Sequence, residues 1–296
     1  MISSNNEWDT LRRVILGTTK NFNFSTDDEK YIKIPNRPSG PADIEKIEET
    51  EAALNDWQSI LEDMDVEVLR PDDLDYQSMD AFGAYCPRDT TLVIGDKVIF
   101  TPNIWEKRTL ERPALIRHFD TNVVAPENKD IMFDAANIIR CNNDILYLVS
   151  YSGNEAGADW LQDYLGPEYK IHKLIDVYKG MHLDSSILPL REGLVMLNSE
   201  WMTDDKLPEF MKSWDKIWIT QDDMWQDPEY NGMTSNWIGI NVLSYDENTI
   251  FCDPKQKTLM NILKKHKVDS IPINIPNTKY FMGAHHCATL DILRSK

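Results

Sequence analysis

The chain has 296 residues, of which 42% are hydrophobic and 27% charged, a balance typical of a folded globular protein. Its net charge of −18 argues against binding nucleic acid, which needs clustered lysine and arginine, and against docking on anionic membranes. No apolar run is long enough to span a bilayer, and the N-terminus lacks the features of a signal peptide.

The chain opens with one loosely built unit of secondary structure. Residues 13–16 are expected to form a strand, and a polar loop with several prolines follows them. Residues 42–64 carry apolar side chains at helical spacing, and residues 66–69 are expected to form a closing strand. Because the proline-bearing loop lies inside this unit, it is interpreted as an insertion and not as a linker between domains.

Four β-hairpins are expected further along the chain, each made of two β-rich runs joined by a short polar turn. Their strand pairs are 91–94 with 97–100, 136–139 with 145–149, 186–190 with 194–197, and 240–243 with 249–252. A helical stretch and a short strand follow each hairpin. The helical stretches are 109–118, 157–165, 207–214 and 256–266, and the closing strands are 122–124, 171–175, 216–219 and 271–274.

The hairpins recur about every 50 residues, which indicates structural repeats of strand, strand, helix and strand. With the opening unit there are five repeats, and their circular arrangement would give a single α/β domain over residues 1–296. Equivalent positions of such repeats converge on one end of the axis. Five residues each stand roughly ten positions before a hairpin turn and are therefore expected to share one pocket. They are Asp89, Asp134, His182, Asp184 and Ser235.

The candidate chemistry centres on Cys287, in the segment His285-His286-Cys287-Ala288-Thr289. His182 and Asp184 stand two apart at the start of an expected strand, so their side chains are expected on one face, and His285 and Cys287 have the same relation. A guanidinium is planar, cationic and rich in N–H donors, so Asp134 and Asp184 are suited to grip its two edges. The thiol of Cys287 would attack the central carbon while His182 carries protons.

Simpler interpretations exist for each of these residues. The four cysteines form neither a disulfide framework nor a zinc motif, so a reducing cytoplasm is expected and each thiol alone is more often a small buried side chain. Asp89 could merely pair with Arg88 or end a strand. His285, His286 and Cys287 resemble a metal cluster, but neighbours on a strand point to opposite faces. We therefore expect no metal, and the chemistry calls for no cofactor.

Several segments resemble the amidinotransferase family, which includes glycine amidinotransferase. The matching pieces run nearly the whole chain and keep their order. They are Glu7-Trp8-Asp9, Arg13-Val14-Ile15-Leu16-Gly17, Arg88-Asp89, Phe133-Asp134-Ala135-Ala136-Asn137, Met181-His182-Leu183-Asp184, Met233-Thr234-Ser235-Asn236-Trp237 and His286-Cys287-Ala288-Thr289. The resemblance implies the pentein fold, a five-bladed α/β propeller, which agrees with the repeats found independently.

The resemblance also implies a ping-pong reaction with L-arginine as donor. The amidino group would pass to Cys287, ornithine would leave, and an acceptor amine would take the group. On the matching positions Cys287 is the nucleophile, His182 the general acid and base, and Asp134 the third member of the triad. The implied substrate contacts are Asp184, Asp89, Ser235 and Met181.

The sequence departs from the family at the donor's far end. Glycine amidinotransferase holds the donor's carboxylate with an arginine beyond the His-x-Asp segment, whereas residues 198–201 contain none. Lys179 and Arg191 are the candidate substitutes; the alternative is a substrate whose far end differs from that of arginine. The terminal motif also has Ala284 and His285 where relatives are often richer in glycine.

Two rival functions use the same features. A hydrolase of the same fold, of the arginine deiminase or dimethylarginine hydrolase type, needs the same thiol, histidine and carboxylates, because only the second nucleophile changes to water. A non-catalytic guanidine-binding protein would need no free thiol at Cys287. The expected partners are small molecules, an arginine-like donor and an amine acceptor, and a homodimer is compatible with the sequence.

Overall fold

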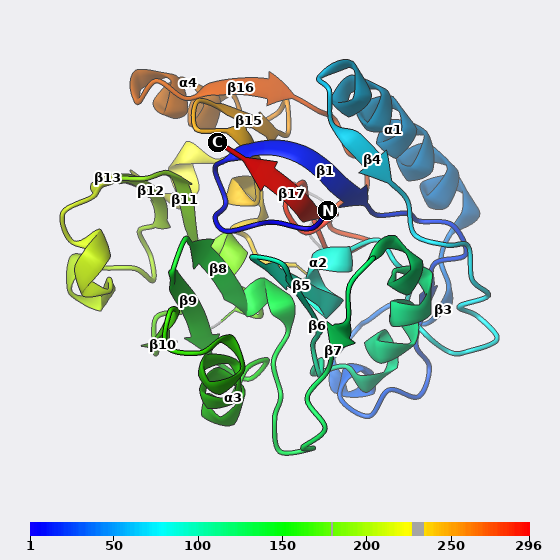
Figure 1. Cartoon of the computed structure of the whole chain (residues 1–296). Coiled ribbons are helices and arrows are strands. Elements are labelled where there is room, and N and C mark those ends of the chain that lie inside the picture. The colour runs from blue at the N-terminus through cyan, green and yellow to red at the C-terminus, as the bar shows by residue number, and fades with distance from the viewer. Residues whose placement is uncertain (179, 227–233) are drawn as a thin grey trace.

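The computed structural model describes residues 1–178, 180–226 and 234–296. This part of the chain contains five three-stranded sheets and one two-stranded pair. Figure 1 shows the sheets following one another around the middle of the molecule. No strand of one sheet pairs with a strand of another, so the described residues form no single closed sheet.

Four sheets share one topology, in which two antiparallel strands are followed by a third that runs parallel to the second. Their strands are β5 (Thr91–Ile94), β6 (Lys97–Phe100) and β7 (Val123–Val124); β8 (Ile138–Cys141), β9 (Asp144–Val149) and β10 (Lys170–Ile175); β11 (Ile187–Arg191), β12 (Leu194–Asn198) and β13 (Asp215–Ile219); and β14 (Leu243–Asp246), β15 (Thr249–Cys252) and β16 (Asp269–Pro272).

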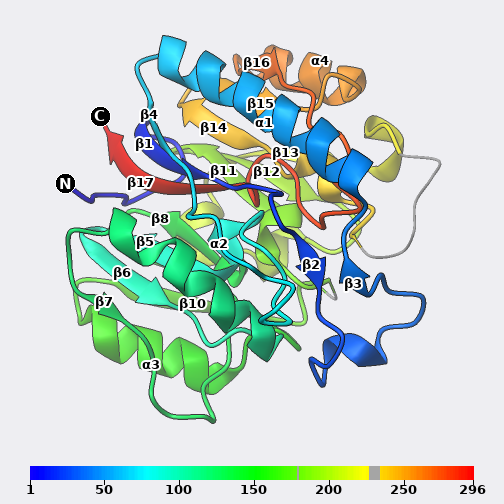
Figure 2. The same ribbon diagram turned by 90° about the vertical axis from the view of Figure 1, so that its right-hand side faces the viewer.

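The fifth sheet joins the two ends of the chain. Strand β1 (Thr10–Leu16) pairs in parallel with β4 (Glu67–Leu69) and antiparallel with β17 (Thr289–Ser295). The C-terminal strand therefore supplies the strand that the opening unit lacks, and the residues just before it are drawn to the centre of the fold. In Figure 2 both termini lie on the same side of the molecule.

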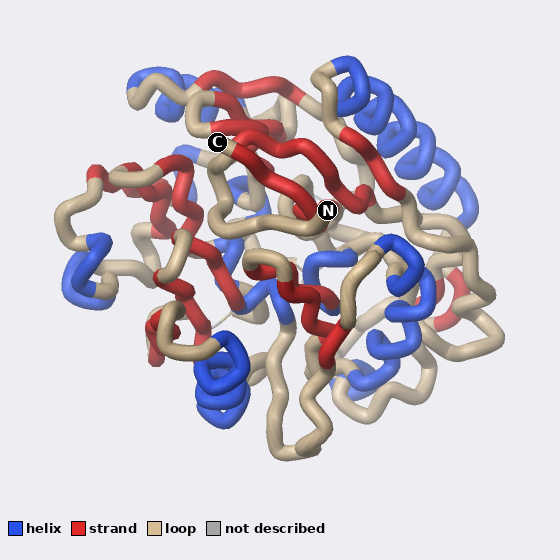
Figure 3. The backbone as a smooth tube through the Cα atoms, in the orientation of Figure 1, coloured by secondary structure: helices blue, strands red, loops and turns tan. Residues whose placement is uncertain are grey.

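The longer helices lie at the periphery, as Figures 1 and 3 show. They are α1 (Ile44–Asp63), α3 (Glu155–Leu165) and α4 (Lys257–Lys265). The side chain of Asp43 caps α1 by accepting from the amide of Glu45, and Asn154 caps α3 in the same manner. Helix α1 buries Leu54, Trp57 and Leu61 against the core.

Some predicted elements differ from the structure. Residues 207–214 form no α-helix but contain the 3₁₀ turn Glu209–Met211, and 109–118 lies in 3₁₀ segments that include Pro113. A proline lacks the amide hydrogen that a longer helix would use. The predicted strand at 240–243 begins instead at Leu243, because Ile238–Ile240 is a 3₁₀ turn. The strand predicted at 271–274 spans Asp269–Pro272. The proline-bearing loop contains a small pair, β2 (Asn23–Phe24) with β3 (Gly40–Pro41).

A short helical turn precedes the first strand of each hairpin sheet. The turns are α2 (Pro87–Thr90), Ala135–Asn137, Leu183–Ser185 and Ile238–Ile240. Each contacts the next in this order, and α2 also contacts β17. The four turns thus meet beside the start of β17, where Cys287 stands.

Ion pairs rather than apolar side chains occupy part of the molecule's centre. Asp291 on β17 bonds to Arg88, Arg140 and Arg294, and Arg140 also bonds to Glu7 at 2.6 Å. All five side chains are at least 90% buried. Such a network stabilises one arrangement only if its partners are all present. Among the described residues, no helix is both long and apolar enough to cross a membrane.

Candidate active site

Cys287 lies in a turn that ends where β17 begins, and its side chain is buried. Its sulfur is 3.4 Å from Oδ2 of Asp184, and its amide donates to Oδ1 of Asn241 at 3.1 Å. The expectation that Cys287 belongs to a strand is wrong. A turn between Phe281 and β17 points the thiol toward the neighbouring helical turns instead of the sheet.

His182 is likewise outside any strand, since it immediately precedes the turn Leu183–Ser185. Its Nε2 lies 2.9 Å from Oδ2 of Asp134, and its Nδ1 lies 3.6 Å from Oδ1 of Asp89. The other oxygen of Asp134 accepts from the amide of Ile104 at 2.9 Å and from Asn103 at 3.1 Å. Both oxygens of Asp134 are thus hydrogen-bonded, and the carboxylate fixes the orientation of the imidazole ring.

A hollow of about 80 Å³ is enclosed by these residues. Six predicted site residues line it, contributed by four separate segments of the chain: Asp89, Met181, His182, Asp184, Ser235 and Cys287. Asp134 stands behind His182 and does not line the hollow. Ser235 shares a hydrogen bond of 2.7 Å with the hydroxyl of Tyr178. Lys179 lies outside the described residues.

Asp89 pairs with Arg108, not with Arg88. The Nη1 of Arg108 is 2.5 Å from Oδ2 of Asp89, whereas Arg88 bonds to Asp291 on β17. The second oxygen of Asp89 is buried and has no hydrogen-bond partner within the described part of the chain. Burial raises the pKa of Asp89, although the charges of His182 and Arg108 oppose this. An N–H donor entering the hollow would satisfy that oxygen.

Comparison with known proteins identifies relatives over the full length of the chain, although no family model matches it. It is 33% identical to inosamine-phosphate amidinotransferase 1 of Streptomyces glaucescens, over 100% of this chain and 97% of the relative. The chain belongs to the amidinotransferase family. It is an enzyme that transfers amidino groups, and the prediction from the sequence motifs is confirmed.

More distant amidinotransferases and solved structures support the same family membership. The L-arginine:L-lysine amidinotransferase of Pseudomonas savastanoi pv. phaseolicola is 27% identical over 99% of this chain and 94% of the relative. The structure of the Streptomyces griseus inosamine-phosphate amidinotransferase superposes with a TM-score of 0.88 at 32% identity, covering 100% of this chain and 97% of that one. DDAH from Pseudomonas aeruginosa, at 13% identity and TM-score 0.70 over 95% of this chain and 99% of that one, shares the fold. These neighbours are pentein-fold proteins, which confirms the α/β class.

Opposing effects set the protonation of Cys287 and His182 in this amidinotransferase. A hydrogen bond with Cys86, burial and the charge of Asp184 together raise the pKa of Cys287 well above its ordinary value. Burial alone would lower the pKa of His182, but the carboxylates of Asp89 and Asp134 raise it well above its ordinary value. Near pH 7 the free amidinotransferase therefore holds a neutral thiol beside an imidazolium.

Sequence reasoning missed His286, whose ring stands behind Asp184. The Nδ1 of His286 is 2.8 Å from Oδ2 of Asp184, and its Nε2 is 3.4 Å from Oε2 of Glu7. Burial would raise the pKa of Asp184, yet the hydrogen bond and charge of His286 hold it below its ordinary value. His285, which we expected on the same face as Cys287, instead bonds to the carbonyl of Ile273 and packs against Trp57.

Cys86 is a second residue that the sequence did not single out. Both Cys86 and Cys287 border Gly283, where an added Cβ would lie 2.4 Å from Sγ of Cys86 and 2.8 Å from Cβ of Cys287. Only glycine therefore fits beside the two thiols. The motif Cys86-Pro87-Arg88-Asp89 was the available signal, but it drew attention to Asp89 alone.

Two further expectations concern ligands. Arg191, a candidate for the donor's carboxylate, bonds to the carbonyls of His266 at 2.8 Å and Glu247 at 3.3 Å, and it does not line the hollow. These bonds engage the guanidinium of Arg191 outside the hollow, so Arg191 is not placed to hold a donor carboxylate there. Within residues 1–178, 180–226 and 234–296, no group of three or more His, Cys, Asp or Glu side chains is placed to hold a metal ion.

Proposed function

We propose that the enzyme moves the amidino group of L-arginine, through a covalent amidino-cysteine, to an acceptor amine and releases ornithine. One observation carries this proposal. In a single hollow, the thiol of Cys287 and the ring of His182, which Asp134 holds from behind, lie beside Asp184 and the oxygen of Asp89 that accepts no hydrogen bond. Two carboxylates beside a nucleophile suit a planar guanidinium, which presents N–H donors along its edges.

Binding of the donor would activate the nucleophile. Because the pKa of Cys287 is raised in the free enzyme despite the neighbouring imidazolium of His182, the thiol stays protonated until a second cation binds beside it. A guanidinium held by Asp89 and Asp184 supplies that charge, and the thiol proton leaves to solvent. The thiolate then attacks the central carbon of the guanidinium to form a tetrahedral intermediate.

His182 would carry the proton in both half-reactions. The carbon–nitrogen bond to ornithine breaks as the imidazolium of His182 protonates the leaving nitrogen, leaving the amidino group on sulfur. Neutral His182 then takes a proton from the acceptor amine, which attacks the same carbon. The carbon–sulfur bond breaks, and the thiolate and the imidazolium are restored. Asp134 keeps the ring aligned throughout through its bond of 2.9 Å.

The five three-stranded sheets support a five-bladed propeller as the scaffold. In this arrangement the short turns that precede β5, β8, β11 and β14, together with the residues before β17, supply the site residues. The single domain over residues 1–296, the homodimer and the cytoplasmic location stay predictions from the sequence.

Product analysis separates transfer from hydrolysis. Enzyme, arginine labelled in its guanidino carbon and a panel of amines (glycine, taurine, ornithine, lysine and β-alanine) are incubated, and the products are identified by mass spectrometry. Transfer predicts that a labelled guanidino product, and ornithine beyond one molecule per enzyme, form only when an amine is added. Citrulline and ammonia, formed without any amine, would establish the hydrolase instead. The names of the relatives include inosamine phosphate, lysine and glycine, so membership of the family leaves the acceptor open.

A further inference from the structure

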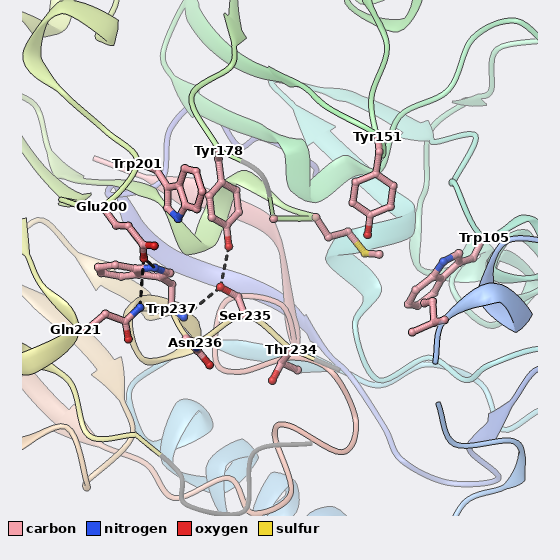
Figure 4. Close-up of a pocket in the computed structure, with 13 residues that line it drawn as sticks. Trp105, Tyr151, Tyr178, Glu200, Trp201, Gln221, Thr234, Ser235, Asn236 and Trp237 are labelled. Atoms are coloured by element: carbon pink, nitrogen blue, oxygen red, sulfur yellow. Dashed lines mark hydrogen bonds between the residues drawn. The ribbon is translucent and has the colours of Figure 1, made fainter. Parts of the chain in front are cut away.

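A larger chamber adjoins the catalytic hollow. It has a volume of about 490 Å³ and shares four lining residues with the hollow: Trp105, Met181, Thr234 and Ser235. Figure 4 shows the side chains that line it. If the proposed function holds, a substrate with its reacting nitrogen at Cys287 must extend the rest of its length into this chamber. The chamber therefore selects the far end of the substrate.

Aromatic rings form much of the chamber's wall. They belong to Trp105, Tyr151, Tyr178, Trp201 and Trp237. Figure 4 shows Trp201, Tyr178 and Trp237 grouped near Glu200, with Trp105 and Tyr151 on the other side of the view. Indole and phenol faces carry negative electrostatic potential and attract cations that lie over them. The same ring faces do not stabilise an anion.

Glu200 is the one charged side chain among the described residues that line the chamber. Its Oε2 accepts from the indole nitrogen of Trp237 at 2.9 Å and from the amide of Gln221 at 3.5 Å. The Oδ1 of Asn198 accepts from its backbone amide at 2.9 Å. Neighbouring donors on two other segments thus fix the carboxylate beside the aromatic wall.

We propose that the chamber binds the ammonium end of a substrate, so that the preferred acceptor is a diamine-type molecule whose second amine lies between Glu200 and the aromatic rings. The negative charge of Glu200 and the negative potential of the ring faces both attract the ammonium group. An acceptor that ends in a carboxylate or phosphate meets repulsion from Glu200. As donor, arginine can present its α-ammonium group to Glu200, provided that its α-carboxylate points away from Glu200.

Three acceptors of matched length test this inference: putrescine, aminobutanol and γ-aminobutyrate, which end in an ammonium, a hydroxyl and a carboxylate. We measure kcat/KM for each with saturating arginine. The expected order is putrescine, then aminobutanol, then γ-aminobutyrate, with about tenfold or more between the first and the last. A preference for γ-aminobutyrate, or no preference, would overturn the inference.

Variants assign the preference to Glu200. Glu200→Gln should lower kcat/KM for putrescine about fivefold or more relative to kcat/KM for aminobutanol. Glu209→Gln makes the same change of charge at an exposed position, paired with Lys212 and outside the chamber, and should alter neither. Lys179→Gln is run in parallel. If wild-type enzyme prefers γ-aminobutyrate and this variant loses the preference, Lys179 receives an anionic end and the inference is wrong.

The donor half-reaction separates failure of this inference from failure of the proposed function. Enzyme mixed with arginine and no acceptor should form the amidino-cysteine whatever the acceptor preference is. A normal adduct with the acceptor order reversed would overturn only the diamine inference. Absence of any adduct would overturn the covalent mechanism on which it rests.

Discussion

The imidazole of His286 lies 2.8 Å from the carboxylate of Asp184, through Nδ1 and Oδ2. The same carboxylate oxygen lies 3.4 Å from the sulfur of Cys287. His286 thus holds the group that we propose to bind the substrate guanidinium, from the side opposite the hollow. Its own position is fixed by Glu7 and by Arg88, which donates to the backbone carbonyl of His286 at 2.8 Å.

Replacement of His286 should impair transfer according to which ring nitrogen the new side chain imitates. The amide nitrogen of His286→Asn can reach Asp184, whereas that of His286→Gln reaches farther, toward Glu7. We expect about a 10- to 100-fold loss of kcat/KM in His286→Gln, the effect of losing a hydrogen bond to a charged group, and a smaller loss in His286→Asn. Steady-state kinetics measures both. Equal losses in two variants that unfold at the wild-type temperature would contradict a positioning role.

Asp184→Asn should make Cys287 more reactive toward iodoacetamide while abolishing most transfer. The charge of Asp184 is one of the effects that raise the pKa of the thiol, after the hydrogen bond with Cys86 and burial. A thiol is unreactive below its pKa, so removing the carboxylate shifts the rise of labelling with pH to lower pH and increases the rate at pH 7. Labelling rates across pH, with the site mapped by mass spectrometry, test this. Slower labelling of Cys287 in the variant would refute it.

Cys86→Ala should separate thiol acidity from transfer. Loss of the hydrogen bond that the Cys287 thiol donates to Cys86 also lowers the pKa of Cys287, so labelling at pH 7 should again be faster than in wild type. Because Cys86 makes no proposed contact with substrate, kcat/KM should stay within about threefold of wild type. A loss of transfer as large as that in Asp184→Asn would show that Cys86 takes part in the reaction.

Arg140 should contribute far more to stability than an arginine of an exposed pair. Arg140→Met leaves Glu7 and Asp291 without this buried cation, and breaking such a pair costs about 3–5 kcal/mol. Arg13→Met removes a bridge of 2.7 Å to the half-exposed Glu67 and should cost about 0–1 kcal/mol. Urea unfolding of both variants gives the two free energies. Similar values would mean that the central network adds little.

Much of the fold was predictable because the hairpins carry local signals. The turn at Gly95 and Asp96, between two β-rich runs, predicts β5 and β6 with correct bounds. Long-range pairing carries no such signal, so the place of β17 beside β1 could not be seen in either segment alone. The absence of a helix at 207–214 reflects how those residues pack, which helical periodicity does not record.

The candidate site was predictable to the level of which residues meet, but not how they are oriented. Spacing before the hairpin turns brought Asp89, His182 and Asp184 to one hollow. Strand alternation then gave the wrong orientation, because helical turns and not strands carry these residues. A backbone turn before β17 decides that His286, and not His285, reaches the site. No residue pattern in the sequence revealed that turn.

The most direct test of the proposed mechanism is the intact mass of the enzyme after mixing with arginine in the absence of any acceptor. We expect wild-type enzyme to gain the mass of one amidino group, mapped to Cys287, with one ornithine released per enzyme molecule, and Cys287→Ser to gain none. An adduct on another residue, or continued turnover in Cys287→Ala, would contradict the mechanism.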